Sequence, residues 1–226
     1  MKTFCFSYIW AGMSMYFLAC SSPDSEEAAL PLPFYNAADF TPEWIDPATP
    51  EYSEIHRVAP FSFLNQDGQV VTEQTVQGKI YVADFFFTFC PGICPRLADN
   101  MSILQDTFLQ DSRILFLSHT VTPWNDSVPV LKAYAGGRGI VSGKWHLLTG
   151  DQAEIYSLAR HSYFAESSQG LSKSEEEFLH SENFLLIDPL RRIRGVYNGT
   201  LPLEMKRLIE DIRLLKAEVI PRPSSL

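Results

Sequence analysis

The stretch IYVADFFFTFCPGICP, residues 80–95, decides the fold of this 226-residue chain. A continuous apolar run from Lys79 to Phe87 predicts a strand that is buried on both faces. Cys90 and Cys94 follow that strand. From Pro95 to Gln110, apolar side chains recur at helical spacing, and proline suits a first helical turn, where no backbone donor is needed. The stretch therefore predicts a buried strand, a loop with two thiols and a helix.

Cys90 and Cys94 are the cysteines that remain once Cys5 and Cys20, near the N-terminus, are set aside. Two nearby thiols can exchange with a disulfide, or they can bind a soft metal ion together with further ligands. In an exported protein they can also form a plain stabilising disulfide. Such a bridge would close a very short loop and would restrict the unfolded chain only a little. The spacing alone leaves these roles open.

The N-terminus has the layout of a secretory signal. Lys2 precedes an apolar run from Phe4 to Ala19 that is too short and too interrupted for a transmembrane helix. The sequence FLAC at residues 17–20 resembles a bacterial lipobox, which predicts a lipid on Cys20; an uncleaved anchor is the alternative. We therefore expect a signal peptide over residues 1–19. The mature protein is expected to be an exported, membrane-anchored lipoprotein, with its domain in the periplasm or outer cell envelope.

Composition divides the rest of the chain into a linker and one domain. Residues 20–50 are rich in Ser, Pro, Asp, Glu and Ala and have no sustained apolar period, which predicts a lipid-anchored flexible linker. Residues 51–226 have the length of a single domain. The formal net charge of -9 argues against nucleic acid as a partner and against binding an anionic membrane by charge.

The patterns of this domain predict its remaining elements. A hairpin over residues 61–72 turns at Asp67 and Gly68. Strands and helices then alternate, and a second hairpin and an amphipathic helix follow. These elements are expected at residues 114–118, 128–135, 145–148, 151–161, 184–197 and 203–215, with Asp151 as a helix cap. The order is that of a thioredoxin-like α/β sandwich with an N-terminal β-hairpin.

A family resemblance rests on several of these motifs together. Residues 84–95, DFFFTFCPGICP, are similar to the CPxxCP signature of the Sco/SenC proteins. Further similarities lie at residues 59–68, 121–126, 147–150 and 180–189, the last of which begins with His180 and Ser181. The resemblance covers residues 55–216. Membership would imply a protein that binds copper and helps to assemble the dinuclear copper site of cytochrome c oxidase.

The resemblance implies a copper site formed by Cys90, Cys94 and His180, and a partner such as subunit II of cytochrome c oxidase or a similar copper protein. Thiolates are soft ligands that favour Cu(I), and imidazole binds both Cu(I) and Cu(II). The N-terminus of the helix after Cys94 carries partial positive charge, which favours the thiolate. Zinc fits less well, because structural zinc takes four ligands and we find no fourth. The other histidines match no motif and are interpreted as structural or surface residues: His56, His119, His146 and His161.

Two further positions near the predicted site are Thr122 and Asp84. Thr122 stands where many relatives have aspartate, which puts any role of that carboxylate in doubt. Asp84 lies six residues before Cys90, the spacing at which thioredoxins carry a buried aspartate. Burial would raise the pKa of Asp84 and let it pass protons during disulfide exchange. Alternatively, Asp84 simply hydrogen-bonds a hydroxyl such as that of Thr88 or Tyr81.

Three functions are compatible with these residues. We favour a copper-binding metallochaperone. The alternatives are a membrane-tethered thiol-disulfide oxidoreductase, in which Cys90 and Cys94 form the catalytic redox pair, and a copper or redox sensor. His180 separates the first two functions, because thiol exchange needs only the two sulfurs.

Overall fold

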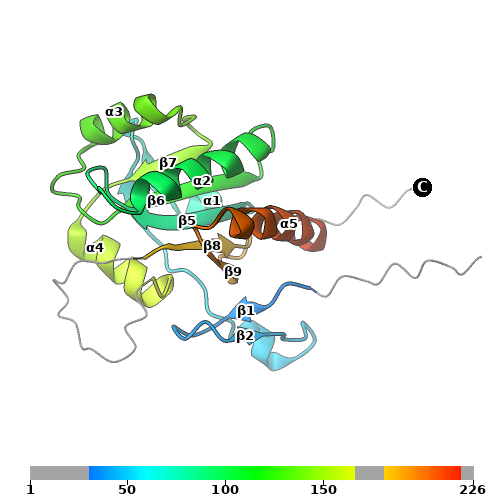
Figure 1. Ribbon diagram of the computed structural model, residues 1–226. Helices are drawn as coiled ribbons and strands as arrows, with labels where there is room; N and C mark the ends of the chain where they lie inside the picture. The colour runs from blue at the N-terminus through cyan, green and yellow to red at the C-terminus, as the bar shows by residue number, and fades with distance from the viewer. Residues whose placement is uncertain (1–30, 166–180, 220–226) are drawn as a thin grey trace, which may run out of the picture. The chain divides into compact units, whose positions relative to one another are not determined.

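The computed structural model describes residues 31–165 and 181–219. Its centre is a five-stranded sheet in the order β7-β6-β5-β8-β9 (Figure 1). Strands β5, β6 and β7 run parallel, whereas β8 is antiparallel to β5, and β9 is antiparallel to β8. The bounds are β5 (Ile80–Phe86), β6 (Ile114–Thr120), β7 (Trp145–Leu148), β8 (Asn183–Ile187) and β9 (Ile193–Asn198). The structure confirms all five strands that the sequence predicted for this sheet.

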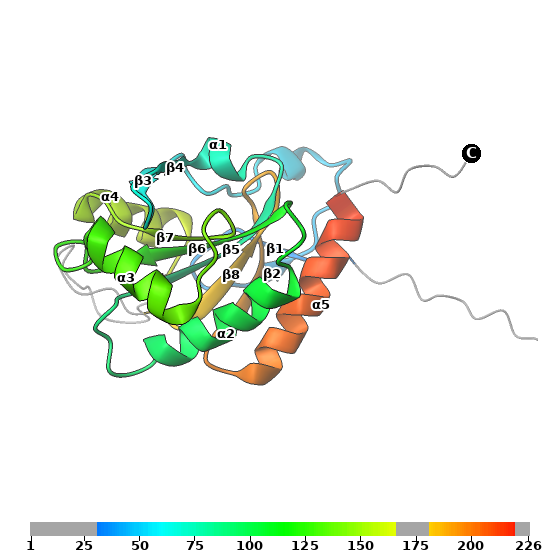
Figure 2. The ribbon, with the colours of Figure 1, turned by 90° about the horizontal axis from the view of Figure 1, so that it is seen from above.

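Helices and a hairpin cover the two faces of the sheet. One face packs against α2 (Cys94–Thr107), α3 (Val128–Arg138) and α5 (Pro202–Val219). The other face packs against β3 (Ser62–Leu64), β4 (Val70–Thr72), α1 (Glu73–Val76), α4 (Gln152–Ser157) and the π-helix η2 (Leu158–Ser162). Figure 2 shows these two groups on opposite sides of the sheet. This arrangement is the predicted sandwich.

Strand β5 supplies apolar side chains to both faces. Ile80 and Val82 pack on the side of α2, whereas Tyr81 and Ala83 pack on the side of the β3–β4 hairpin. All seven residues of β5 are buried. Because successive strand side chains point to opposite faces, a central strand covered on both sides needs a continuous apolar sequence. Each large apolar side chain buried in this way stabilises the fold by about 1.5–3 kcal/mol.

Local signals in the sequence place several element ends as predicted. Pro95 lies in the first turn of α2. The carboxylate of Asp151 caps α4 by accepting a hydrogen bond from the backbone N–H of Glu154, with 3.0 Å between the atoms. In the first hairpin, Gly68 has a φ of 71°, which L side chains rarely adopt and which explains glycine at this turn.

The predicted flexible linker is wrong from Pro31 onward. Residues 31–53 form the short strands β1 (Phe34–Tyr35) and β2 (Pro42–Glu43) and the 3-10 helix η1 (Pro50–Ser53). The buried Arg194 of β9 holds this segment, because its guanidinium donates to the backbone oxygen of Pro33 at 3.0 Å and lies 4.2 Å from the Phe34 ring centroid. Phe34 is only 5% exposed. Cation–π contact and backbone hydrogen bonds therefore order a segment that has no apolar period.

Two predicted site residues, Cys20 and His180, lie outside the described residues. Over residues 31–165 and 181–219, no helix combines the length and the apolar character needed to cross a membrane. The signal peptide and the lipid anchor stay predictions.

Candidate metal centre

Cys90 and Cys94 lie where β5 leads into α2. Cys90 is in the loop between these elements and is partly exposed, whereas Cys94 is the first residue of α2 and is buried. Both are free thiols. The backbone N–H of Cys94 donates to Sγ of Cys90, with 3.5 Å between nitrogen and sulfur. The structure thus brings the two predicted thiols together at the N-terminus of a helix.

The two thiols differ in acidity. Burial disfavours ionisation of Cys90, but hydrogen bonds from the Cys94 thiol and from nearby backbone N–H groups outweigh it and lower the pKa of Cys90. Burial raises the pKa of Cys94 to about 12, and the hydrogen bond with Cys90 and the charge of Asp84 act in the same direction. Cys90 is therefore the thiol that ionises first and that an incoming metal ion or disulfide meets.

A cavity of about 330 Å³ lies beside the thiols. Apart from the two cysteines, its lining residues are Phe85, Phe87, Pro91, Gly92, Ile93, Val121 and Ser181. Ser181 directly follows His180 in the chain. Among the described residues, no group of three His, Cys, Asp or Glu side chains is placed to hold a metal ion. Two adjacent thiols in an apolar cavity are a soft donor pair, which fits Cu(I).

A buried carboxylate, Asp126, fastens the loop that leads to Cys90. It is completely buried and accepts hydrogen bonds from the hydroxyls of Thr88, Thr120 and Thr122, the last at 3.0 Å. The backbone N–H of Thr88 also donates to Asp126, at 3.2 Å. These bonds join the loop after β5 to the loop after β6. The Thr122 hydroxyl serves here as a donor to Asp126.

Asp84 lies in β5 on the α2 side and is 3% exposed. It accepts a hydrogen bond from the hydroxyl of Ser118, which in turn accepts one from the indole of Trp145 at 2.8 Å. A hydroxyl partner was predicted correctly, but the named candidates were wrong, because Thr88 bonds Asp126 and Tyr81 bonds a tyrosine on the opposite face. Burial raises the pKa of Asp84 to about 7, although the Ser118 hydrogen bond opposes the rise.

His119 lies inside an aromatic cluster rather than at the thiols. Its ring stacks on Phe85, with 5.3 Å between centroids. The rings of Phe61 and Phe63 meet it in T-shaped contacts, and Tyr163 lies tilted beside it. Within the described part of the chain, neither ring nitrogen has a hydrogen-bond partner. Burial lowers the pKa of His119 to about 3, so the ring is neutral. The sequence did not predict this cluster, because its members come from four separate segments.

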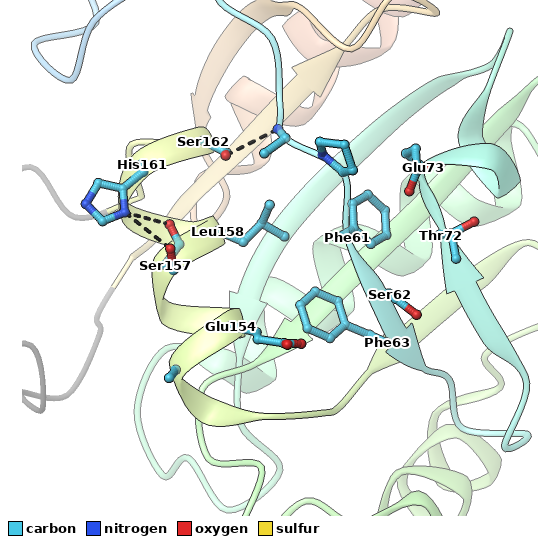
Figure 3. A pocket seen from close by; sticks show the side chains of 13 residues that line it. Phe61, Ser62, Phe63, Thr72, Glu73, Glu154, Ser157, Leu158, His161 and Ser162 are labelled. Carbon is cyan, nitrogen blue, oxygen red and sulfur yellow. Dashed lines mark hydrogen bonds between the residues drawn. The ribbon is translucent and has the colours of Figure 1, made fainter.

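A larger cavity, about 870 Å³, lies between the β3–β4 hairpin and the α4–η2 segment (Figure 3). It shares no lining residue with the thiol cavity. Phe61, Phe63 and Leu158 form apolar walls, and the imidazole of His161 bonds the backbone oxygen of Ser157, at 3.1 Å, within its own helical segment. The soft donor pair is absent from this lining, so we place the candidate metal centre at the smaller cavity.

The fold and the thiol pair define a thioredoxin-like thiol protein. The SCO1/SenC family model matches residues 50–216, and the chain belongs to this family. The SCO1 protein homolog of Bacillus subtilis (strain 168) is 31% identical over 160 residues, which are 70% of this chain and 82% of that protein. The predicted family is therefore confirmed.

Solved structures of family members resemble this one. A SCO1/SenC family lipoprotein from Bacillus anthracis has a TM-score of 0.62 at 28% identity, covering 71% of this chain and 95% of that one. BsSco, a member of the Sco family of cytochrome c oxidase assembly proteins with a disulfide switch, has a TM-score of 0.59 at 28% identity, covering 72% and 95%. Arabidopsis thaliana ScoI with copper bound has a TM-score of 0.54 at 28% identity, covering 69% and 97%. These structures confirm the thioredoxin-like fold.

Proposed function

We propose that this chain is a copper-binding metallochaperone that assists assembly of the dinuclear copper site of cytochrome c oxidase. The observation that carries the proposal is the pair of adjacent free thiols, Cys90 and Cys94, in an apolar cavity that Ser181 also lines. The copper bound to the Arabidopsis relative and the oxidase-assembly role of the family of BsSco support it.

The proposed ligands are Cys90, Cys94 and His180. In the sequence, His180 directly precedes Ser181, which lines the thiol cavity. Bound copper would take electron density from both thiolates, and imidazole would support Cu(II) as well as Cu(I). The protein's own contribution is to hold the thiols ready. The Cys94 N–H favours the Cys90 thiolate, and Asp126 fixes the loop that carries Cys90.

We further propose that the chain is exported and carries a lipid on Cys20. The lipobox-like sequence at residues 17–20 and the lipoprotein from Bacillus anthracis support this location, with the domain in the periplasm or outer cell envelope. Subunit II of cytochrome c oxidase, or a similar copper protein, is the proposed partner. A Cys20→Ala chain should accumulate as an unprocessed precursor in membranes, as intact-mass measurement would show. An unmodified wild-type chain that begins at Met1 in the cytoplasm would contradict this location.

A thiol-disulfide oxidoreductase is the second candidate, and the unequal thiols favour it. Cys90 is accessible and has a lowered pKa, whereas Cys94 is buried and has a raised pKa. This is the arrangement of an attacking thiol and a resolving thiol. Cys90 would attack a partner's disulfide and displace one partner thiolate. Cys94 would then attack Sγ of Cys90 in this mixed disulfide and displace the second partner thiolate, which leaves Cys90 and Cys94 oxidised and the partner's pair reduced.

His180→Ala separates the two candidates. The substitution should lower Cu(II) affinity sharply and impair oxidase maturation, while reduction of a disulfide by Cys90 and Cys94 should stay nearly normal. His161→Ala is the matched control, because this exposed histidine lies at the other cavity. Normal copper binding and normal oxidase maturation in the His180 variant would favour the oxidoreductase instead.

A further inference from the structure

Two exposed aromatic side chains lie on the two loops that border the thiol cavity. Phe89, the residue before Cys90, is 73% exposed, and Trp124, in the loop after β6, is 58% exposed. Among the described residues, Trp44 is the one other large aromatic residue that is more than half exposed, and its indole bonds the backbone oxygen of Pro31. Because exposed aromatic residues are enriched where proteins bind one another, their concentration beside the thiols needs an explanation.

The fold holds the two aromatic residues on loops that are bonded to each other. The backbone N–H of Thr88 donates to the carboxylate of Asp126 at 3.2 Å. Just below these loops, the backbone N–H of Val121 donates to the backbone oxygen of Phe86 at 2.9 Å. Phe89 and Trp124 are each within two residues of such a bond. Because both loops are ordered before any partner arrives, little backbone freedom is lost on binding.

The same two loops present no exposed charge. Residues 85–95 contain no Asp, Glu, Lys or Arg, and in residues 120–127 the one charged residue, Asp126, is completely buried. This neutrality contrasts with a chain whose formal net charge is -9. An interface over these loops therefore gains from apolar burial and depends little on charge pairing.

We propose that Phe89 and Trp124 form an apolar docking surface for a copper acceptor protein whose own metal ligands lie in uncharged, apolar surface. This inference rests on the proposed function. Copper can pass between proteins by ligand exchange only if an acceptor ligand reaches the ion that Cys90 holds. The acceptor must then cover the loops around Cys90, on which Phe89 and Trp124 are the most exposed large apolar side chains, ahead of Ile93 at 40%. So small an apolar rim suits a transient interface, which buries less than about 1,200 Å².

The test uses full-length Phe89→Ser and Trp124→Ser chains, reduced and loaded with copper. Leu203→Ser is the matched control, because Leu203 is 74% exposed and lies in α5. Each chain is mixed either with the copper-free soluble domain of cytochrome c oxidase subunit II or with the chelator bathocuproine disulfonate. Neither Phe89 nor Trp124 lines the thiol cavity, so both variants should bind copper and release it to the chelator as the wild type does.

Transfer to the subunit II domain should be about tenfold slower for each aromatic variant and unchanged for Leu203→Ser. The wild-type rate should change by less than about twofold between about 50 mM and about 500 mM salt. Equal transfer by all chains, equal slowing by Leu203→Ser, or a steep salt dependence would each overturn the docking surface. If the wild type binds no copper, the proposed function fails. In that case the affinity of each reduced chain for the subunit II domain tests the docking surface. Phe89→Ser and Trp124→Ser should bind more weakly than the wild type and Leu203→Ser, and equal binding by all chains would overturn it.

Discussion

Replacing Asp84 with asparagine removes a buried carboxylate without changing the shape of the side chain. The pKa of Asp84 is raised from 3.8 to about 7 by burial. Because the folded-state pKa lies above the unfolded one, the folded state binds the proton more tightly, so stability is lost as pH rises from about 3.8 to about 7 and the full cost is present above pH 7. Three pKa units correspond to about 4 kcal/mol. Asp84→Asn should therefore raise the free energy of unfolding by up to about 4 kcal/mol at pH 8.

The gain should disappear at pH 4, where the folded carboxyl group is protonated and the amide merely replaces it. The hydrogen bond from Ser118 is retained, because the amide oxygen of asparagine also accepts. Urea unfolding of the reduced chain at pH 4 and pH 8 measures the difference, with the exposed Asp106→Asn as control. Iodoacetamide reaction against pH should also show a lower pKa for Cys94, since Asp84 contributes to its rise. A stability change of equal size at both pH values would refute the argument.

Three further predictions concern the rest of the site. The pKa of His119 falls from 6.5 to about 3, so the unfolded state takes up the proton first and stability is lost as pH falls below 6.5. His119→Leu should remove about 2 kcal/mol of this loss at pH 5. If the free energy of unfolding of the variant falls with pH as steeply as that of the wild type, the prediction is wrong. Asp126→Ala leaves several buried donors without an acceptor and should lower the free energy of urea unfolding by about 2–4 kcal/mol, whereas the control Asp106→Ala should lower it by under about 0.5 kcal/mol. The Asp126 variant should also be alkylated faster at Cys90. Oxidation of Cys90 and Cys94 to a disulfide should abolish copper uptake in a titration, because the thiolates are the proposed ligands; equal uptake by oxidised and reduced chains would contradict the assignment.

The sequence predicted the features that depend on neighbouring residues. The apolar run from Lys79 to Phe87 is enough by itself to predict a strand that is buried on both faces, and the two cysteines follow this strand in the sequence. The position of Asp151, just before the apolar residues of α4, predicts that it caps this helix. Both signals are local, because burial on two faces and helix capping each leave their mark within one segment.

Features that depend on distant contacts were missed. The partner of Asp84 is Ser118, because the parallel register of β5 and β6 pairs these two residues, and no local pattern specifies that register. Asp126 and Thr88 meet only when two loops come together. The segment that forms β1 and β2 was predicted to be flexible because residues 20–50 have no sustained apolar period, and Arg194, which holds it, lies far along the chain.

The proposed copper ligands are Cys90, Cys94 and His180. X-ray absorption of the reduced, full-length chain loaded with one Cu(II) measures the ligand set directly. We expect two sulfur ligands and a histidine nitrogen, with one sulfur lost in either cysteine-to-alanine variant and the imidazole signal lost in His180→Ala. A wild-type spectrum without sulfur, or an imidazole signal that persists in His180→Ala, would contradict this ligand set.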